Sequence, residues 1–291
     1  MTWQFAVAGL VVGLLVGLTG MGGGSLMTPM LILIFGFNPK TAVGTDILHG
    51  AIFKSFGAWR HRQLGNVHTK LALWMLAGSG PLSLLGVQIA SSFSDSATGR
   101  MTQIVGLSLI LGGIGFFIKT FFPRKPIEED DYFAITTRVK VIAIMIGAVF
   151  GFIVVLTSVG SGTFFGLALL LLFPLSATRM VGTDLLHAAL LLWIAGAGHL
   201  LHGNVDMHAM TWLLVGSIPG VLIASHFSIH VPDRTLRVAF AVVLLLSGVK
   251  LVKLPAADQI VEVGGALAIA GFFVWGARSM MRGRPAAPAI D

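Results

Sequence analysis

Ionisable side chains occur at two places inside segments that are otherwise apolar. Asp46 and His49 lie three residues apart, which places them on one face of a helix, and Asp184 and His187 repeat this spacing. Burying such a group in a bilayer costs at least about 2.5 kcal/mol, so each is a functional candidate. Because histidine titrates near neutral pH, we expect these four residues to couple transport of a solute to protons. The alternatives are structural: an Asp caps a helix start, and a neutral imidazole bonds to a neighbouring helix.

Lys54 continues the same helical face, whereas Leu192 occupies the matching place beside the second pair. A cation inside a span could attract an anionic substrate, extend to the membrane surface or pair with Asp46. A different group has the composition of a metal site, namely His199, His202, Asp206 and His208. Its spacing is irregular, so we expect solvated loop residues there and no metal.

Clusters of small residues at 20–24 and 158–162 interrupt two apolar segments. Consecutive glycines weaken a helix by roughly 1 kcal/mol each, and Pro29 after Thr28 is typical of a helix start. A helix N-terminus inside a cavity favours anions, because its N–H groups are unpaired and its dipole is positive there. Close packing or a hinge is the alternative. The candidate substrate-binding residues are Gly22, Gly23, Gly24, Ser25, Thr28 and Thr45, and then Ser158, Gly160, Ser161, Gly162, Thr163 and Thr183.

The segments that carry these residues are those of a membrane protein. Of 291 residues, 55% are hydrophobic and 11% are charged, and the mean hydropathy of +0.90 excludes a soluble enzyme fold. Runs such as 139–155 are apolar on every side, which indicates helices rather than the alternating strands of a barrel. The net charge of +7 comes from basic residues that stand singly or in pairs, so it indicates membrane orientation and no nucleic-acid partner. The chain has no Cys, which excludes disulfides and thiolate metal sites.

The chain contains an internal repeat. Residues 43–49 and 181–187 are identical at six of seven positions, so that Val43 corresponds to Val181. The same fixed shift, which we call the repeat offset, pairs His61 with His199 and Pro81 with Pro219. Identities at polar residues are not explained by shared hydrophobicity. The sequence therefore predicts two copies of one unit.

Each copy has five apolar segments, of which the second is short. The segments are about 4–19, 24–37, 42–59, 70–91 and 101–122, then 139–157, 161–174, 180–198, 208–227 and 236–253, with an eleventh at about 260–277. A run of about 14 residues cannot cross ~30 Å of hydrocarbon, so we expect a half-helix there. The expected domains are a membrane repeat (1–122), a cytoplasmic linker (123–138), a second repeat (139–255), an extra transmembrane helix (256–281) and a disordered tail (282–291).

Basic residues predict the orientation. Fourteen of the 19 Lys and Arg residues fall on one side of this arrangement, which the positive-inside rule makes cytoplasmic. The N-terminus is then outside and the C-terminus inside the plasma (inner) membrane. The 60–70 loop faces the cytoplasm and the 199–208 loop faces outward, so the two repeats are inverted. The predicted fold is an all-α polytopic membrane protein with two inverted-topology repeats and one extra C-terminal helix.

The Gly-rich break with Thr28-Pro29, the Val43-Gly44-Thr45-Asp46 segment and their second copies resemble the TauE/SafE sulfite exporter family, also called TSUP permeases. The resemblance covers about residues 5–280. It implies transport, often outward, of small sulfur-containing or organic anions such as sulfite, sulfonates or sulfoacetate. The second copy departs from the Gly-rich pattern, with Ser158 and Ser161 in place of Gly20 and Gly23.

The residues and the resemblance together predict a secondary anion transporter and not an enzyme, with alternating access about a midplane site. No Walker motif is present, so an ion gradient or the substrate's own gradient supplies the energy. A divalent-metal permease is the alternative, and a membrane-embedded enzyme is a weaker one. The expected partners are the bilayer, a small anion, coupled protons and further copies in a homo-oligomer, without a cofactor.

Overall fold

All regular elements that the structure describes are helices. The computed structural model describes residues 2–19, 24–93, 98–121, 134–160, 162–227, 233–267 and 270. Its labelled helices are α1 (Thr2–Thr19), α2 (Gly24–Leu33), α3 (Pro39–Gln63), α4 (Thr69–Ser92), α5 (Thr98–Phe121), α6 (Thr137–Thr157), α7 (Phe164–Leu172), α8 (Ala177–Leu201), α9 (Met207–Phe227) and α10 (Asp233–Val252). Residues 257–267 are also helical. The predicted all-α class and the order of the segments are confirmed.

Helix lengths separate membrane-crossing elements from short ones. Five described helices are long and apolar enough to cross a bilayer, namely those within Thr69–Ser92, Thr98–Ile118, Thr137–Thr157, Thr178–Leu201 and Met207–Ala224. In contrast, α2 has 10 residues and α7 has 9. At about 1.5 Å per residue each spans roughly half of the hydrocarbon core. The second apolar segment of each predicted copy therefore forms a short helix, as predicted.

Two helices begin earlier than the hydropathy indicated. Asn38 caps α3 and accepts a hydrogen bond from the N–H of Lys40, while Ser176 caps α8. Asp46 and Asp184 lie about two turns inside these helices, so the interpretation of either Asp as an N-terminal cap is wrong. Pro29 is likewise not at a helix start, because α2 already begins at Gly24.

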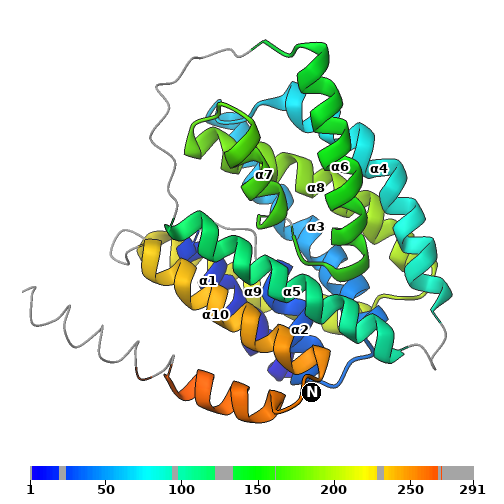
Figure 1. Cartoon of the computed structure of the whole chain (residues 1–291), viewed down its shortest axis with the longest axis vertical. Helices are drawn as coiled ribbons and strands as arrows, with labels where there is room; N and C mark the ends of the chain where they lie inside the picture. Colours follow the sequence, from blue (N-terminus) through cyan, green and yellow to red (C-terminus); the bar gives the residue numbers. More distant parts are fainter. Residues whose placement is uncertain are drawn as a thin grey trace, which may run out of the picture.

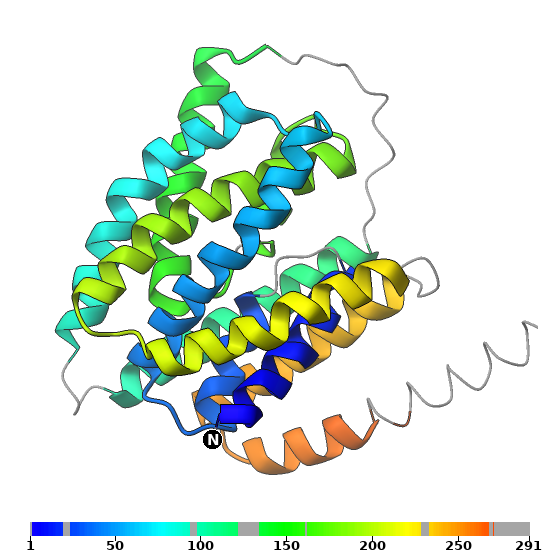
Figure 2. The same cartoon turned by 180° about the vertical axis from the view of Figure 1, so that it is seen from behind.

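The long helices pack in pairs: α1 lies along α9, α4 along α6, α5 along α10 and α3 along α8. Figures 1 and 2 show the α1–α9 and α4–α6 pairs in different parts of the molecule, with α3 between them. Glycine permits the close approach. A Cβ at Gly9 would overlap the backbone carbonyl of Leu213, and one at Gly147 would overlap that of Met75. The repeat offset relates these two contacts, because it pairs Gly9 with Gly147 and Met75 with Leu213.

Aromatic contacts bring the start of α1 and the end of α2 together. The Phe5 ring lies 4.7 Å from that of Phe35 and 5.9 Å from that of Phe37, measured between centroids. It also lies 6.4 Å from His208 at the start of α9. The start of α1 and the segment after α2 thus lie together at one end of the bundle.

Residues 123–133 of the predicted linker lie outside the described residues, and its last two residues, 137 and 138, already belong to α6. The tail 282–291 and residues 271–281 of the predicted extra helix also lie outside the described residues. Residues 257–267, a described part of that helix, appear in orange in Figure 1. Lys250 of α10 forms an ion pair with Asp258 at its start.

Candidate functional site

One carboxylate oxygen joins three elements in the interior of the bundle. Asp46 of α3 is 1% exposed, and its Oδ2 accepts hydrogen bonds from the Thr28 N–H at 3.1 Å and the Thr28 hydroxyl at 2.6 Å. The Ser158 hydroxyl, at the end of α6, donates a third bond to the same oxygen at 2.8 Å. Asp46 therefore holds α2 and the α6–α7 connection against α3.

The matching aspartate in α8 has different surroundings. At the repeat offset, Thr28 corresponds to Gly166 and Ser158 corresponds to Gly20, so neither partner hydroxyl is present. Asp184 is also buried, and it interacts electrostatically with Lys54. The two aspartates, alike in sequence, thus both interact with Lys54, but the Thr28 and Ser158 hydroxyls that bond to Asp46 have no counterparts at the positions matching them around Asp184.

The break between α6 and α7 has the backbone expected of a broken helix. Ser158 adopts the left-handed conformation at φ 57°, and Gly160 and Gly162 have φ of 131° and 94°. Thr163 follows as the N-cap residue of α7, but its side chain makes no capping hydrogen bond. Its hydroxyl oxygen is buried without a hydrogen-bond partner among the described residues. The first turn of α7 thus presents an unpaired polar group to the interior.

Part of the predicted site lies outside the described residues. Gly22, Gly23 and Ser161 are not described. Gly24 and Ser25 belong to the first turn of α2, and nothing is described of their side chains.

Both histidines of the repeated motif bond to a serine on another helix. His49 Nε2 lies 2.9 Å from Ser217 Oγ of α9, and His187 Nε2 lies 2.9 Å from Ser79 Oγ of α4. Each of these pairs shares a hydrogen bond and is buried. The interhelical bonding considered for these histidines is therefore present at both positions.

The serines were missed by the sequence reasoning, although a signal was available. Ser79 and Ser217 each follow a glycine and stand two residues before Pro81 and Pro219, and the repeat offset relates the two serines. Their identity in both copies could have selected them as partners of the two histidines.

The threonines that precede the aspartates bond to loop backbone. The Thr45 hydroxyl accepts a hydrogen bond from the Asp206 N–H at 2.9 Å, and the Thr183 hydroxyl accepts one from the His68 N–H at 2.9 Å. Thr183 also donates to the Arg179 carbonyl at 2.6 Å. These hydroxyls, proposed from the sequence as substrate ligands, bond the α8–α9 loop to α3 and the α3–α4 loop to α8.

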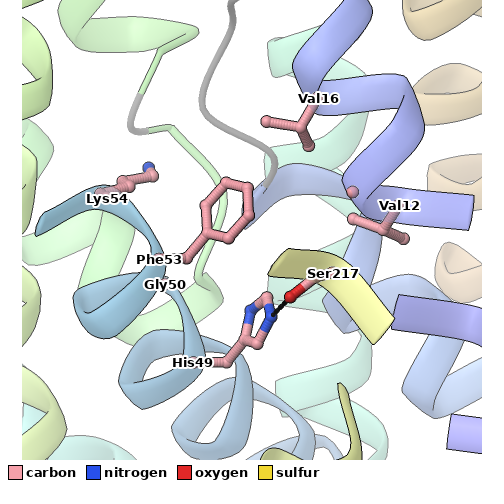
Figure 3. Close-up of a pocket in the computed structure, with 8 residues that line it drawn as sticks. Val12, Val16, His49, Gly50, Phe53, Lys54 and Ser217 are labelled. Atoms are coloured by element: carbon pink, nitrogen blue, oxygen red, sulfur yellow. Dashed lines mark hydrogen bonds between the residues drawn. The ribbon is translucent and has the colours of Figure 1, made fainter. Parts of the chain in front are cut away.

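Lys54 is buried, with 2% of its surface exposed, and its charge interacts with the carboxylates of Asp184 and Asp46. The predicted alternative in which this lysine extends to the membrane surface is therefore wrong. Lys54 borders a small cavity between α1, α3 and α9. Figure 3 shows the His49–Ser217 hydrogen bond beside this cavity, with Val12 and Val16 of α1 on the facing wall.

The four residues with a metal-site composition are engaged separately. His199 belongs to α8 and is fully buried, with Nε2 3.2 Å from the Val155 carbonyl, so the expectation of a solvated loop histidine is wrong for it. His202 Nε2 lies 3.1 Å from Gln88 Oε1, and Asp206 accepts from the Ala209 N–H. Among the described residues, no group of three or more His, Cys, Asp or Glu side chains could hold a metal ion.

Comparison with known proteins supports a membrane function for this arrangement. The family model described as Sulfite exporter TauE/SafE matches residues 5–251. The chain is also similar to two proteins of Bacillus subtilis (strain 168). It is 39% identical over 255 residues to "Probable membrane transporter protein YjnA", covering 87% of this chain and 100% of YjnA. It is 26% identical over 242 residues to "Probable membrane transporter protein YdhB", covering 83% and 96% of the two chains. No solved structure matches the chain.

Proposed function

Because the chain belongs to the TauE/SafE sulfite exporter family of membrane transporters, we propose that it moves small sulfur-containing or organic anions, such as sulfite, sulfonates or sulfoacetate. It acts as a secondary transporter, and its physiological direction is export. The observation that carries the proposal is the buried start of α7, where the Thr163 hydroxyl has no partner among the described residues. A helix N-terminus with an unpaired donor stabilises negative charge.

The two short helices contribute differently to this anion site. At α2 the Thr28 N–H already donates to Asp46, so that donor is satisfied by the protein itself. At α7 the Thr163 hydroxyl remains for a ligand, within a connection whose glycines allow close approach of the backbone. The anion therefore contacts the Thr163 hydroxyl at the start of α7 on its way through the protein.

We further propose that residues 1–122 and 139–255 are inverted repeats that rock about the α3–α8 pair. Support comes from contacts that occur twice, once in each half, when every residue is replaced by its partner at the repeat offset. The α1–α9 contact corresponds to the α6–α4 contact, and the His49–Ser217 hydrogen bond corresponds to the His187–Ser79 hydrogen bond. An exchange of partners of this kind is what a two-fold axis between halves produces. In this proposal the N-terminus is outside and the C-terminus cytoplasmic.

Protons are the proposed coupling ion, and Asp46, His49, Asp184 and His187 are the residues proposed to carry them. All four are buried in α3 and α8, at the centre of the proposed rocking motion. Glutamine at positions 49 and 187 keeps a hydrogen-bonding side chain but cannot take up a proton. Transport by these variants should lose its dependence on a pH gradient, and a gradient dependence identical to that of the parent would contradict the proposed coupling.

Uptake into proteoliposomes tests the substrate class. We expect saturable uptake of sulfite and methanesulfonate, driven more strongly with a pH gradient than without one, and no uptake of Mn²⁺. Thr163→Val should lower sulfite uptake about tenfold, because a hydrogen bond to a charged ligand contributes roughly 1.5 kcal/mol or more. Thr211→Val is the matched control, since the Thr211 hydroxyl bonds to the Met207 carbonyl of its own exposed helix face. Uptake of Mn²⁺ without anion uptake would overturn the proposal in favour of a divalent-metal permease.

A further inference from the structure

The two His–Ser pairs have the same geometry but different surroundings. Next to the His49–Ser217 pair, α1, α3 and α9 leave a cavity of about 10 Å³, just enough for about one water molecule. Figure 3 shows the side chains that line this cavity. Its walls are formed by Val12, Gly13, Val16, His49, Gly50, Phe53, Lys54 and Ser217.

The corresponding place in the second half is filled with apolar side chains. The repeat offset replaces Val12 by Phe150, Gly50 by Ala188 and Lys54 by Leu192. The Phe165 ring packs edge-on against His187 with 4.4 Å between centroids, and Phe150 lies edge-on against Phe165 at 5.8 Å. Beside its His–Ser pair, one half therefore has space and a cation, where the other has packed rings and a leucine.

We propose that the cavity between α1, α3 and α9 is a binding site for one singly charged oxyanion. Lys54 attracts the anion by its charge, and His49 and Ser217 orient it by hydrogen bonds. This inference rests on the proposed function and specifies where the anion passes. Because the cavity accommodates only about a water molecule, the site opens for the anion as α1 and α9 move away from α3.

The charges near the cavity favour a monoanion over a dianion. Lys54 supplies one positive charge, and that charge already interacts with the carboxylates of Asp184 and Asp46. A second negative charge on the ligand would be repelled by these carboxylates, and the described residues of the cavity wall include no further Lys or Arg to balance it. Hydrogensulfite and short sulfonates meet this condition, whereas sulfate does not.

Two substitutions test the site, and each introduces the residue type found at the matching position of the other half. Val12→Phe fills the cavity but keeps the charge of Lys54, whereas Lys54→Leu removes that charge. Leu192→Met is the matched control at the position that corresponds to Lys54, since this swap conserves volume. Folding of each purified variant is checked by thermal unfolding and gel filtration, and Val12→Phe decides the question if Lys54→Leu does not fold.

Equilibrium binding of radiolabelled sulfite to the purified full-length protein is the measurement. Val12→Phe and Lys54→Leu should each weaken binding by roughly tenfold or more, because the lost charged contact exceeds about 1.4 kcal/mol, while Leu192→Met stays within about twofold. Methanesulfonate should compete with sulfite, and sulfate at the same concentration should not. Equal competition by sulfate would overturn the charge selection.

The two proposals fail in different ways. If the parent protein takes up anions but Val12→Phe binds and transports sulfite as the parent does, the cavity assignment is overturned and the anion transporter stands. If the parent neither binds nor takes up any of the anions, the proposed function is overturned, and the site with it.

Discussion

The Ser158 position provides a prediction whose size follows from the structure. Two effects act there in opposite directions: the Ser158 hydroxyl donates to Asp46 at 2.8 Å, and the backbone has a φ of 57°. Ser158→Ala removes the hydrogen bond and keeps the unfavourable backbone conformation. Ser158→Gly removes the same bond, but glycine adopts the left-handed conformation without steric cost.

The two effects are of similar magnitude. Loss of a buried hydrogen bond to a carboxylate costs about 1.5 kcal/mol, and two donors from Thr28 still satisfy Oδ2 of Asp46. A non-glycine residue in the left-handed region costs about 1 kcal/mol. We therefore expect Ser158→Ala to lower the free energy of unfolding by about 1.5 kcal/mol and Ser158→Gly by only about 0.5 kcal/mol.

Thermal unfolding of both variants in the same detergent measures this difference. For a chain of this size 1 kcal/mol corresponds to about 2 °C in Tm, so the glycine variant should melt about 2 °C above the alanine variant. Adding Thr28→Val to Ser158→Ala should give a loss that departs from the sum of the single losses, because both hydroxyls bond to one oxygen. Equal melting of the glycine and alanine variants, or strict additivity with Thr28→Val, would refute the reasoning.

Three further predictions concern packing, pH and topology. Gly147→Ala should lower stability by roughly 1–3 kcal/mol in equilibrium unfolding, since its Cβ overlaps a carbonyl of α4, whereas Gly99→Ala meets nothing within 4 Å and should be neutral. Burial lowers the pKa of His68, whose Nδ1 caps α4, so the unfolded chain takes up this proton at a higher pH than the folded chain does. The free energy of unfolding should therefore decrease as the pH is lowered below about 6.5, the ordinary pKa of histidine, and His68→Asn should make this decrease smaller. The chain has no native Cys, so Gln63→Cys and Leu201→Cys, at matched exposed positions, should react with an impermeant thiol reagent from opposite sides of the membrane. Labelling of both from one side would contradict the inverted repeats.

Local features of the fold could be predicted because local physics determines them. Apolar runs of about 20 residues identified the long helices, and the glycines around Gly160 and Gly162 identified the break between α6 and α7. Helix starts were placed about three residues late, because Asn38 and Ser176 are polar caps that hydropathy does not register.

Long-range partners in the site could not be predicted in the same way. Asp46 and Ser158 are 112 residues apart, and their contact depends on how α3 packs against the end of α6. Burial of Lys54 likewise follows from the packing of α1, α8 and α9 around α3, which no local pattern specifies. The repeat could have indicated Ser79 and Ser217, since positions that match at a fixed offset have matching partners.

Counterflow in proteoliposomes tests the central claim, alternating-access transport of a small anion, most directly. Vesicles loaded with unlabelled sulfite are diluted into a trace of labelled sulfite. A transporter that exposes its site to one side at a time exchanges the two pools, so the labelled anion should accumulate transiently above its equilibrium level. If labelled sulfite rose only to its equilibrium level, with the same time course as in vesicles without preloaded sulfite, the result would contradict alternating-access transport.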